Sequence, residues 1–382
     1  MLSSSWFLRF LAISLASSLA LAGRPSSCWK NGQFDTLVTF GDSYTDETRL
    51  GYFILHNGSA PPVGWDGGVV RRFQDLATCG HRGIPIDLKQ GFHTASGGLS
   101  WARYAAIYSS STLYNYAVSG AVCSNKISPR LFSAINAPFP DIDGYELPAY
   151  LADSNYTTPN GTKFFTGTPS STVYAIWIGT NDLGNDAFLT DSQLPNKTVA
   201  DYMDCVYTQI DRLYASGARY FVLLNLAPLN LLPQYALPQD GGLAATQYFA
   251  TKIHMNSTAI NGRMHETVAA LNQVYQYRTP YETAALSRSW DEVHIASFDV
   301  NALMTDIYYN PQMYLNGTAP PDVEGVVHLC DAVHTSNCTT ASSPDSYEWY
   351  DALHPSEQTS RVIASEFINV VKGESGYAAY WG

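Results

Sequence analysis

Three polar side chains in two distant segments have the types and spacing of a serine nucleophile with its base and orienting acid. Ser43 comes after the β-branched and apolar run Thr36 to Phe40, so we expect it where a buried strand ends. Asp351 and His354 lie three residues apart, just before Pro355, which suits the first turn of a helix. Such a turn can place both side chains on one side. His354 could then accept the hydroxyl proton of Ser43 while Asp351 orients the imidazole ring.

Acyl transfer by a serine also needs hydrogen-bond donors directed at the oxyanion of the tetrahedral intermediate. Gly120 and Asn181 follow two further strand-like runs, Leu113 to Val118 and Thr172 to Ile178. The predicted oxyanion donors are the backbone amides of Ser43 and Gly120 and the side-chain amide of Asn181. Taken alone, the Gly-Asp-Ser tripeptide that ends the first run is equally typical of an ordinary turn, and only the combination favours catalysis.

Strand-like runs alternate with helical patterns along the chain. The five runs are Thr36 to Phe40, Leu113 to Val118, Thr172 to Ile178, Tyr220 to Leu226 and Ile295 to Val300. This alternation predicts an α/β fold, with a parallel sheet covered by helices on both faces. In such sheets the ligand crevice lies beyond the carboxyl ends of the strands, where the candidate residues stand. Of two long irregular segments, Ile127 to Ser170 and Pro311 to Pro344, the first is expected to form a rim of the active site.

The first 22 residues have the composition of a secretory signal peptide. A basic Arg9 precedes the apolar run Phe10 to Leu21, and the small residues Ala20 to Ala22 suit cleavage before Gly23. We therefore expect a secreted protein in which residues 23–382 form a single catalytic domain. No later apolar segment reaches the roughly 20 residues that a spanning helix needs, so no stable membrane association is expected.

Charge and cysteine content narrow the function further. The formal net charge of -12 and the pI near 5.1 exclude a nucleic-acid partner, which would require clustered basic residues. Six cysteines in an exported chain allow up to three disulfides and 15 pairings, of which Cys330 with Cys338 is favoured. With His328 and His334 these cysteines also have a zinc-like spacing, but an oxidising compartment favours the disulfide. We predict no metal, no cofactor and a monomer.

Seven Asn-X-Ser/Thr sequons predict a eukaryotic glycoprotein and place their asparagines at the surface. These are Asn57, Asn155, Asn160, Asn196, Asn256, Asn316 and Asn337.

Four motifs of the chain together resemble the SGNH hydrolases, the GDSL esterase/lipase superfamily. They are Gly41-Asp-Ser43-Tyr-Thr-Asp46, Gly120 at the end of Asn115-Tyr-Ala-Val-Ser-Gly120, Gly179-Thr-Asn181-Asp182, and Asp351-Ala-Leu-His354-Pro355. They follow the order of the family and span nearly the whole mature chain. The resemblance implies a flavodoxin-like, three-layer α/β/α sandwich with a parallel five-stranded sheet and loop insertions. It also implies the roles given above for Ser43, Gly120, Asn181, Asp351 and His354.

Within that superfamily, the predicted secretion, the sequons and the stretch Thr94 to Arg103 are similar to fungal carbohydrate esterases of family 16. These are exo-acting acetylesterases that remove acetyl groups from hemicellulose-derived oligosaccharides, which implies a small-molecule or oligosaccharide ester as the substrate. Trp65 and Trp101 could be platforms on which a sugar ring stacks, although tryptophan more often serves packing.

Two other functions compete with this interpretation. A lipase or phospholipase for longer acyl esters would use the same catalytic groups, but it needs a wide apolar channel that a sequence does not reveal. A non-catalytic sugar-binding module could keep an esterase fold, although the presence of every catalytic group argues against it.

Overall fold

The fold is built around a mixed seven-stranded β-sheet. The computed structural model describes residues 28–71, 94–289, 292–332, 334 and 336–382, so the predicted signal peptide and Cys79 lie outside the described residues. The strands follow the order β13-β8-β7-β6-β1-β3-β2. Their bounds are β1 Thr36–Gly41, β2 Val69–Val70, β3 Thr112–Asn115, β6 Thr172–Trp177, β7 Tyr220–Leu224, β8 His294–Phe298 and β13 Ala378–Trp381.

Five neighbouring strands of the sheet, β3, β1, β6, β7 and β8, run parallel. They overlap with the five strand-like runs of the sequence, so the predicted α/β class is confirmed. The predicted five-stranded sheet is wrong in its strand number, because β2 and β13 each add an antiparallel strand at one edge. Strand β2 has only two residues, too few to show a period of two in the sequence.

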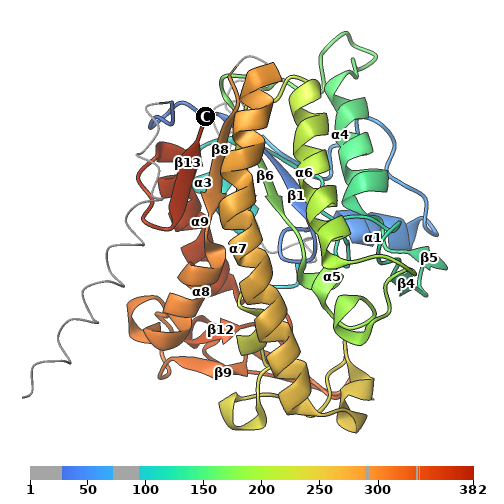
Figure 1. Ribbon diagram of the computed structural model, residues 1–382, viewed down its shortest axis with the longest axis vertical. Helices are drawn as coiled ribbons and strands as arrows, with labels where there is room; N and C mark the ends of the chain where they lie inside the picture. Colours follow the sequence, from blue (N-terminus) through green and yellow to red (C-terminus); the bar gives the residue numbers. More distant parts are fainter. Residues whose placement is uncertain (1–27, 72–93, 290–291, 333, 335) are drawn as a thin grey trace, which may run out of the picture.

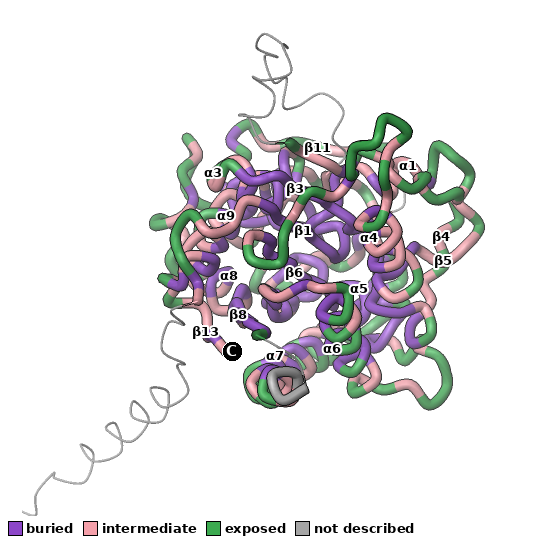
Figure 2. Tube along the Cα trace, turned by 90° about the horizontal axis from the view of Figure 1, so that it is seen from above, coloured by how far each residue is buried: buried purple, intermediate pink, exposed green. Residues whose placement is uncertain are grey.

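Helices cover both faces of the sheet. Figure 1 shows α6 and α7 in front of the strands with α3 and α9 behind them, and Figure 2 shows these two pairs on opposite sides of the buried strands. The helices are α1 Arg49–Leu55, α3 Trp101–Ser109, α4 Leu147–Ser154, α5 Thr180–Leu183, α6 Val199–Ala215, α7 Ser257–Ser289, α8 Val300–Tyr309 and α9 Glu357–Lys372. No helix in the described part of the chain combines the length and hydropathy needed to cross a bilayer.

Helix α9 fixes the segment that holds Asp351 and His354. Its N-cap Ser356 accepts the backbone N–H of Thr359 through its hydroxyl at 3.1 Å, which satisfies one of the unpaired donors of the first turn. The backbone N–H of Ser356 donates to Glu348 O at 2.8 Å, which ties the start of α9 to a short strand, β12 Tyr347–Trp349. The apolar face of α9 packs against α3, so the loop before it has a rigid base.

Both long insertions contain more regular structure than the sequence suggested. The first holds the hairpin β4 Leu131–Phe132 and β5 Ala137–Pro138, a π-helix at Ile142–Glu146, and α4. The second holds β9 Asp322–Val326, which pairs with β12, and the hairpin β10 His328–Cys330 and β11 Cys338–Thr340. Strands this short leave little periodicity to detect.

Two disulfides stabilise the described part of the chain. Cys330 and Cys338 face each other across β10 and β11 and are bonded, as predicted. A second disulfide joins Cys123 to Cys205, a pairing that the sequence had left open. The asparagines of all seven sequons lie at exposed positions, so their predicted surface location is confirmed.

Candidate active site

Ser43 lies at the carboxyl end of β1, where the chain turns sharply. Gly41 ends the strand with φ +151°, and a Cβ there would approach Trp177 O of the neighbouring strand to 2.2 Å, so only glycine fits. The backbone N–H groups of Thr45 and Asp46 then donate to Asp42 O, both at 2.9 Å. This tight turn holds the Ser43 side chain beyond the end of the sheet.

His354 reaches Ser43 across a sequence separation of 311 residues, and Asp351 reaches His354. His354 Nε2 lies 2.9 Å from Ser43 Oγ, and His354 Nδ1 lies 2.8 Å from Asp351 Oδ1. All three residues are at most 9% exposed. Because the carboxylate only accepts, Nδ1 carries the hydrogen and Nε2 is left as the acceptor that faces the hydroxyl.

Asp351 is held in its ionised form by several donors. Burial alone raises the pKa of this carboxyl, but His354, the Leu353 N–H at 2.9 Å and the Tyr248 hydroxyl at 2.7 Å together bring the pKa below its ordinary value. The Tyr248 ring also contacts the His354 ring edge-on, with centroids 5.3 Å apart. Asp351 can therefore stay negative and favour an imidazolium beside it.

Gly120 and Asn181 border the same space as Ser43. Gly120 has φ +84°, and a Cβ there would lie 2.3 Å from the Phe139 ring, so a side chain is excluded. Asn181 Nδ2 donates to Ala121 O at 2.9 Å, which uses one of its two hydrogens and leaves the other for a ligand.

Ser43, Gly120, Asn181 and His354 all line one cavity of about 360 Å³, a size found in small-molecule sites. The other lining residues are Leu50, Ala95, Ser119, Arg130, Phe132, Phe139, Thr180, Gly184, Asn185, Tyr235, Tyr248 and Leu353. Arg130, Phe132 and Phe139 come from the first insertion, which thus borders the site as predicted.

The two tryptophans proposed as sugar platforms do not line this cavity. Trp101 is 1% exposed, packs against Phe367 with ring centroids 5.0 Å apart, and donates to Thr45 Oγ1 at 3.0 Å. Its predicted role as a platform is wrong, because no face of the ring reaches solvent. Trp65 is half-buried and packs edge-on against Tyr52, with centroids 5.1 Å apart.

Two buried acids outside the predicted catalytic set, Asp46 and Glu146, position the strand ends. Asp46 Oδ2 accepts both the backbone N–H and the hydroxyl of Ser119, at 2.8 and 2.9 Å, which ties the segment before Gly120 to the Ser43 turn. Glu146 accepts the backbone N–H of Gly41 at 2.9 Å, and burial raises its pKa well above the ordinary value. Asp46 lies within the first motif, but no pattern in the sequence distinguishes Glu146.

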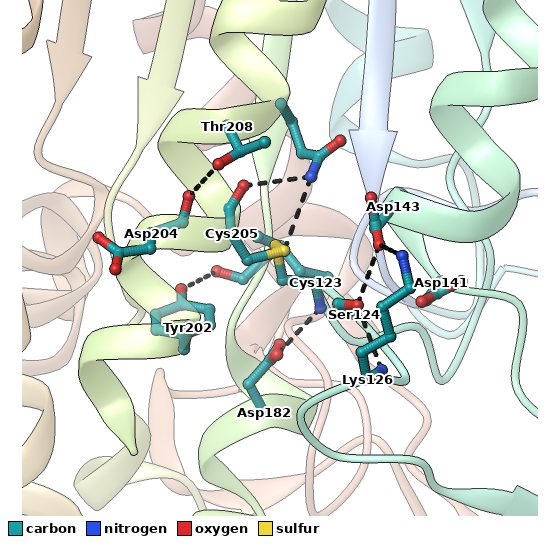
Figure 3. Close-up of a disulfide and its surroundings, with 12 residues drawn as sticks. Cys123, Ser124, Lys126, Asp141, Asp143, Asp182, Tyr202, Asp204, Cys205 and Thr208 are labelled. Carbon is teal, nitrogen blue, oxygen red and sulfur yellow. Dashed lines mark hydrogen bonds and ion pairs between the residues drawn. A yellow bond between two sulfur atoms is a disulfide. The ribbon is translucent and has the colours of Figure 1, made fainter. Parts of the chain in front are cut away.

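A disulfide and a buried aspartate brace the segment that carries Asn181. In Figure 3, Asp182 points toward the backbone of Cys123, which is bonded to Cys205 on α6. Asp182 Oδ1 accepts the Cys123 N–H at 2.9 Å, and burial raises the pKa of Asp182 to about 7. Asp42, next to the nucleophile, is buried too, and its pKa rises to about 6 for the same reason. The loop after β3 is thus joined to α6 by the disulfide and to the loop after β6 by a hydrogen bond.

The zinc-like spacing of the sequence brings His328, Cys330 and Cys338 within reach of one another. The two sulfur atoms are bonded to each other, so neither is available as a thiolate ligand. The absence of a metal stays a prediction.

Comparison with known proteins identifies the family. Residues 37–367 match the family described as GDSL-like Lipase/Acylhydrolase, a range that contains all four motifs. The chain belongs to this family. This GDSL hydrolase is also 37% identical over 350 residues to an acetylesterase of Hypocrea jecorina, with 91% of this chain and 92% of the relative covered.

Other relatives are more distant. An acetylesterase of Thermothelomyces thermophilus is 27% identical and covers 60% of this chain and 66% of its own length. A GDSL esterase/lipase of Arabidopsis thaliana is 22% identical, with 94% of this chain and 97% of the relative covered. Family and relatives agree on the reaction class, so this GDSL hydrolase is a carboxylic ester hydrolase.

Proposed function

We propose that the protein is a secreted acetylesterase that removes O-acetyl groups from hemicellulose-derived oligosaccharides through a Ser43 acyl-enzyme. The observation that carries the catalytic part is the 2.9 Å contact between Ser43 Oγ and His354 Nε2, within a cavity that also contains Gly120 and Asn181. The names of the two fungal acetylesterases support the acetyl group as the acyl part. The oligosaccharide part rests on the resemblance of the sequence to family 16 carbohydrate esterases.

In the first half of the reaction, Ser43 Oγ attacks the ester carbonyl carbon while His354 Nε2 takes the hydroxyl proton. Asp351 stabilises the imidazolium, because its carboxylate lies 2.8 Å from Nδ1. The backbone N–H groups of Ser43 and Gly120 and the Asn181 amide hold the oxyanion. The intermediate then collapses, the bond from the carbonyl carbon to the sugar oxygen breaks, and the imidazolium gives its proton to that oxygen, which leaves as a hydroxyl group.

In the second half, water attacks the acetyl group on Ser43. His354 Nε2 accepts a proton from that water and then passes it to Ser43 Oγ as acetate leaves. The same oxyanion donors serve both halves, since the tetrahedral carbon occupies one place.

The cavity supports a short acyl group. Its volume of about 360 Å³ must accommodate both the acyl part and part of the alcohol. Phe132 and Phe139 stack with centroids 4.4 Å apart and form one wall, a surface suited to the apolar face of a sugar ring. A channel for a long acyl chain would need a larger volume than this.

A series of 4-nitrophenyl esters from acetate to palmitate tests the proposal, with Ser43→Ala as the control. We expect fast acetate hydrolysis that falls with chain length and is lost in Ser43→Ala. Acetylated xylo-oligosaccharides would then be assayed for released acetate. A preference for long chains would favour a lipase, and the absence of Ser43-dependent hydrolysis of any ester would leave a binding module.

Secretion, glycosylation and a monomeric state belong to the same proposal. The Cys123–Cys205 and Cys330–Cys338 disulfides fit an oxidising compartment. Expression in a eukaryotic host should give a protein in the medium that begins at Gly23, as read by N-terminal sequencing. Its mass should fall on treatment with an N-glycosidase, and light scattering should give one chain per particle. Retention in the cells with residues 1–22 intact would contradict the proposed secretion.

A further inference from the structure

Arg130 contacts both residues that are proposed, beside Ser43, to bind the oxyanion. Arg130 lies near the start of the first insertion, and its side chain lines the cavity. Arg130 Nη1 donates to Asn181 Oδ1 at 2.6 Å and to Gly120 O at 3.1 Å. One guanidinium nitrogen thus bridges the two strand-end loops that carry the proposed donors.

We propose that Arg130 is a positioning residue that orients and polarises the oxyanion hole. A guanidinium has donors and no acceptor, so it can face only the oxygen of the Asn181 amide. This contact decides which way the amide is turned, and Nδ2 must then lie on the side of Ala121 O and the cavity. Without Arg130 only the bond to Ala121 O would hold the amide, and an amide rotated by 180° would present its oxygen and repel an oxyanion.

The charge of Arg130 adds an electrostatic contribution. A hydrogen bond from a cation to the amide oxygen draws electron density from Nδ2, which makes its free hydrogen a stronger donor. Burial lowers the pKa of Arg130, whereas Tyr235, Asp186, Asp182 and Asp42 raise it. An arginine keeps its proton at any working pH, so the positive charge persists beside the reacting carbonyl.

The environment of Arg130 fits a functional charge better than packing alone. Its Nε is buried and has no hydrogen-bond partner among the described residues. Burying an incompletely paired guanidinium costs free energy, which a neutral side chain of similar shape would avoid. The guanidinium also lies 5.4 Å from the centre of the Phe139 ring, the same ring that confines Gly120.

The inference rests on the proposed Ser43 mechanism and is tested by a double-mutant cycle on 4-nitrophenyl acetate. We expect Arg130→Met to lower kcat by about 10- to 100-fold with KM changed less than about threefold, since loosening a donor costs less than the roughly 100- to 1000-fold of removing one. In an Asn181→Ala background, the same substitution should lower kcat by a clearly smaller factor, because the amide it orients is gone and only its bond to Gly120 O and its charge remain.

Arg278→Met is the matched control. Arg278 likewise lies against an aromatic ring, 4.6 Å from the centre of Tyr207, and pairs with Asp204 and Glu282 on α6 and α7, outside the cavity. Its kcat should equal that of the wild type. If Arg130→Met does not fold, the cycle is run with Arg130→Lys, which keeps the charge but not the planar fork and should show a smaller loss.

The outcomes separate the two proposals. Equal losses from Arg130→Met in both backgrounds, or a rise in KM alone, would overturn the positioning role while Ser43-dependent hydrolysis stands. Ester hydrolysis that is as fast in Ser43→Ala as in the wild type would instead overturn the proposed function.

Discussion

Replacing Asp351 with asparagine removes one negative charge from the site and little else. The asparagine oxygen can still accept the backbone N–H groups of Leu353 and His354, which donate to Asp351 Oδ1, each at 2.9 Å. The new amide can donate to the Tyr248 hydroxyl, which accepts as well as donates. We therefore expect Asp351→Asn to fold normally.

The loss in catalysis can be worked from the distance between Asp351 and His354. A carboxylate and an imidazolium joined by the observed 2.8 Å bond have their charges centred about 4 Å apart, which is worth about 4 kcal/mol at an effective dielectric constant near 20. The imidazolium forms only as Ser43 attacks, so the loss of this attraction raises the barrier by about 4 kcal/mol. We expect kcat to fall by about 1000-fold.

The assay compares kcat and KM of Asp351→Asn and wild type on 4-nitrophenyl acetate, together with their melting temperatures. Asp191→Asn is the matched control, since Asp191 also pairs with a basic residue, Arg263, but is 68% exposed and outside the cavity. A loss below tenfold, with an unchanged melting temperature, would refute the reasoning. It would mean that another acceptor, such as a backbone carbonyl, orients His354.

Three further predictions concern residues around the site and in the core. Tyr248→Phe removes one of the donors that lower the pKa of Asp351, so this carboxyl loses its charge earlier as pH falls, and kcat/KM should decline at a higher pH than in the wild type; superimposable pH profiles would contradict this. Glu348 is fully buried, and burial raises its pKa well above 4.5. The stability of the wild type should therefore fall as pH rises from the pKa of Glu348 in the unfolded chain, near 4.5, to its pKa in the folded protein. Within this pH window, calorimetry should show that the free energy of unfolding of Glu348→Gln, relative to that of the wild type, rises by about 1.4 kcal/mol per pH unit. A difference that does not change with pH would show that Glu348 is already ionised in the folded protein. Gly120→Ala should lose about 1–3 kcal/mol of stability in denaturant titrations and most of its activity, because of the positive φ and the contact with Phe139; wild-type values for both would show that the loop can adjust.

The strands and the catalytic motifs could be predicted because their signals are local. A run such as Thr172 to Ile178 shows its β-branched and apolar character within a few residues, and β6 occupies Thr172–Trp177. Ser43 and Asn181 were found because each follows such a run, and parallel strands bring their carboxyl ends to one edge. The edge strand β2 was not predicted, because its two residues, Val69 and Val70, are too few to show an alternating pattern.

The α/β class, the Cys330–Cys338 disulfide and the residues expected to meet at the end of the sheet could all be predicted from the sequence alone. The packing of the whole chain was needed to show that Trp101 is core, that Tyr248 holds Asp351, and that Arg130 bridges Gly120 and Asn181. The Tyr248–Asp351 contact joins residues 103 positions apart, and the Arg130 contacts depend on how the first insertion folds back over the strand ends. A periodic pattern reports which face of an element is buried, whereas the partner of a single polar atom is fixed only once all the elements pack.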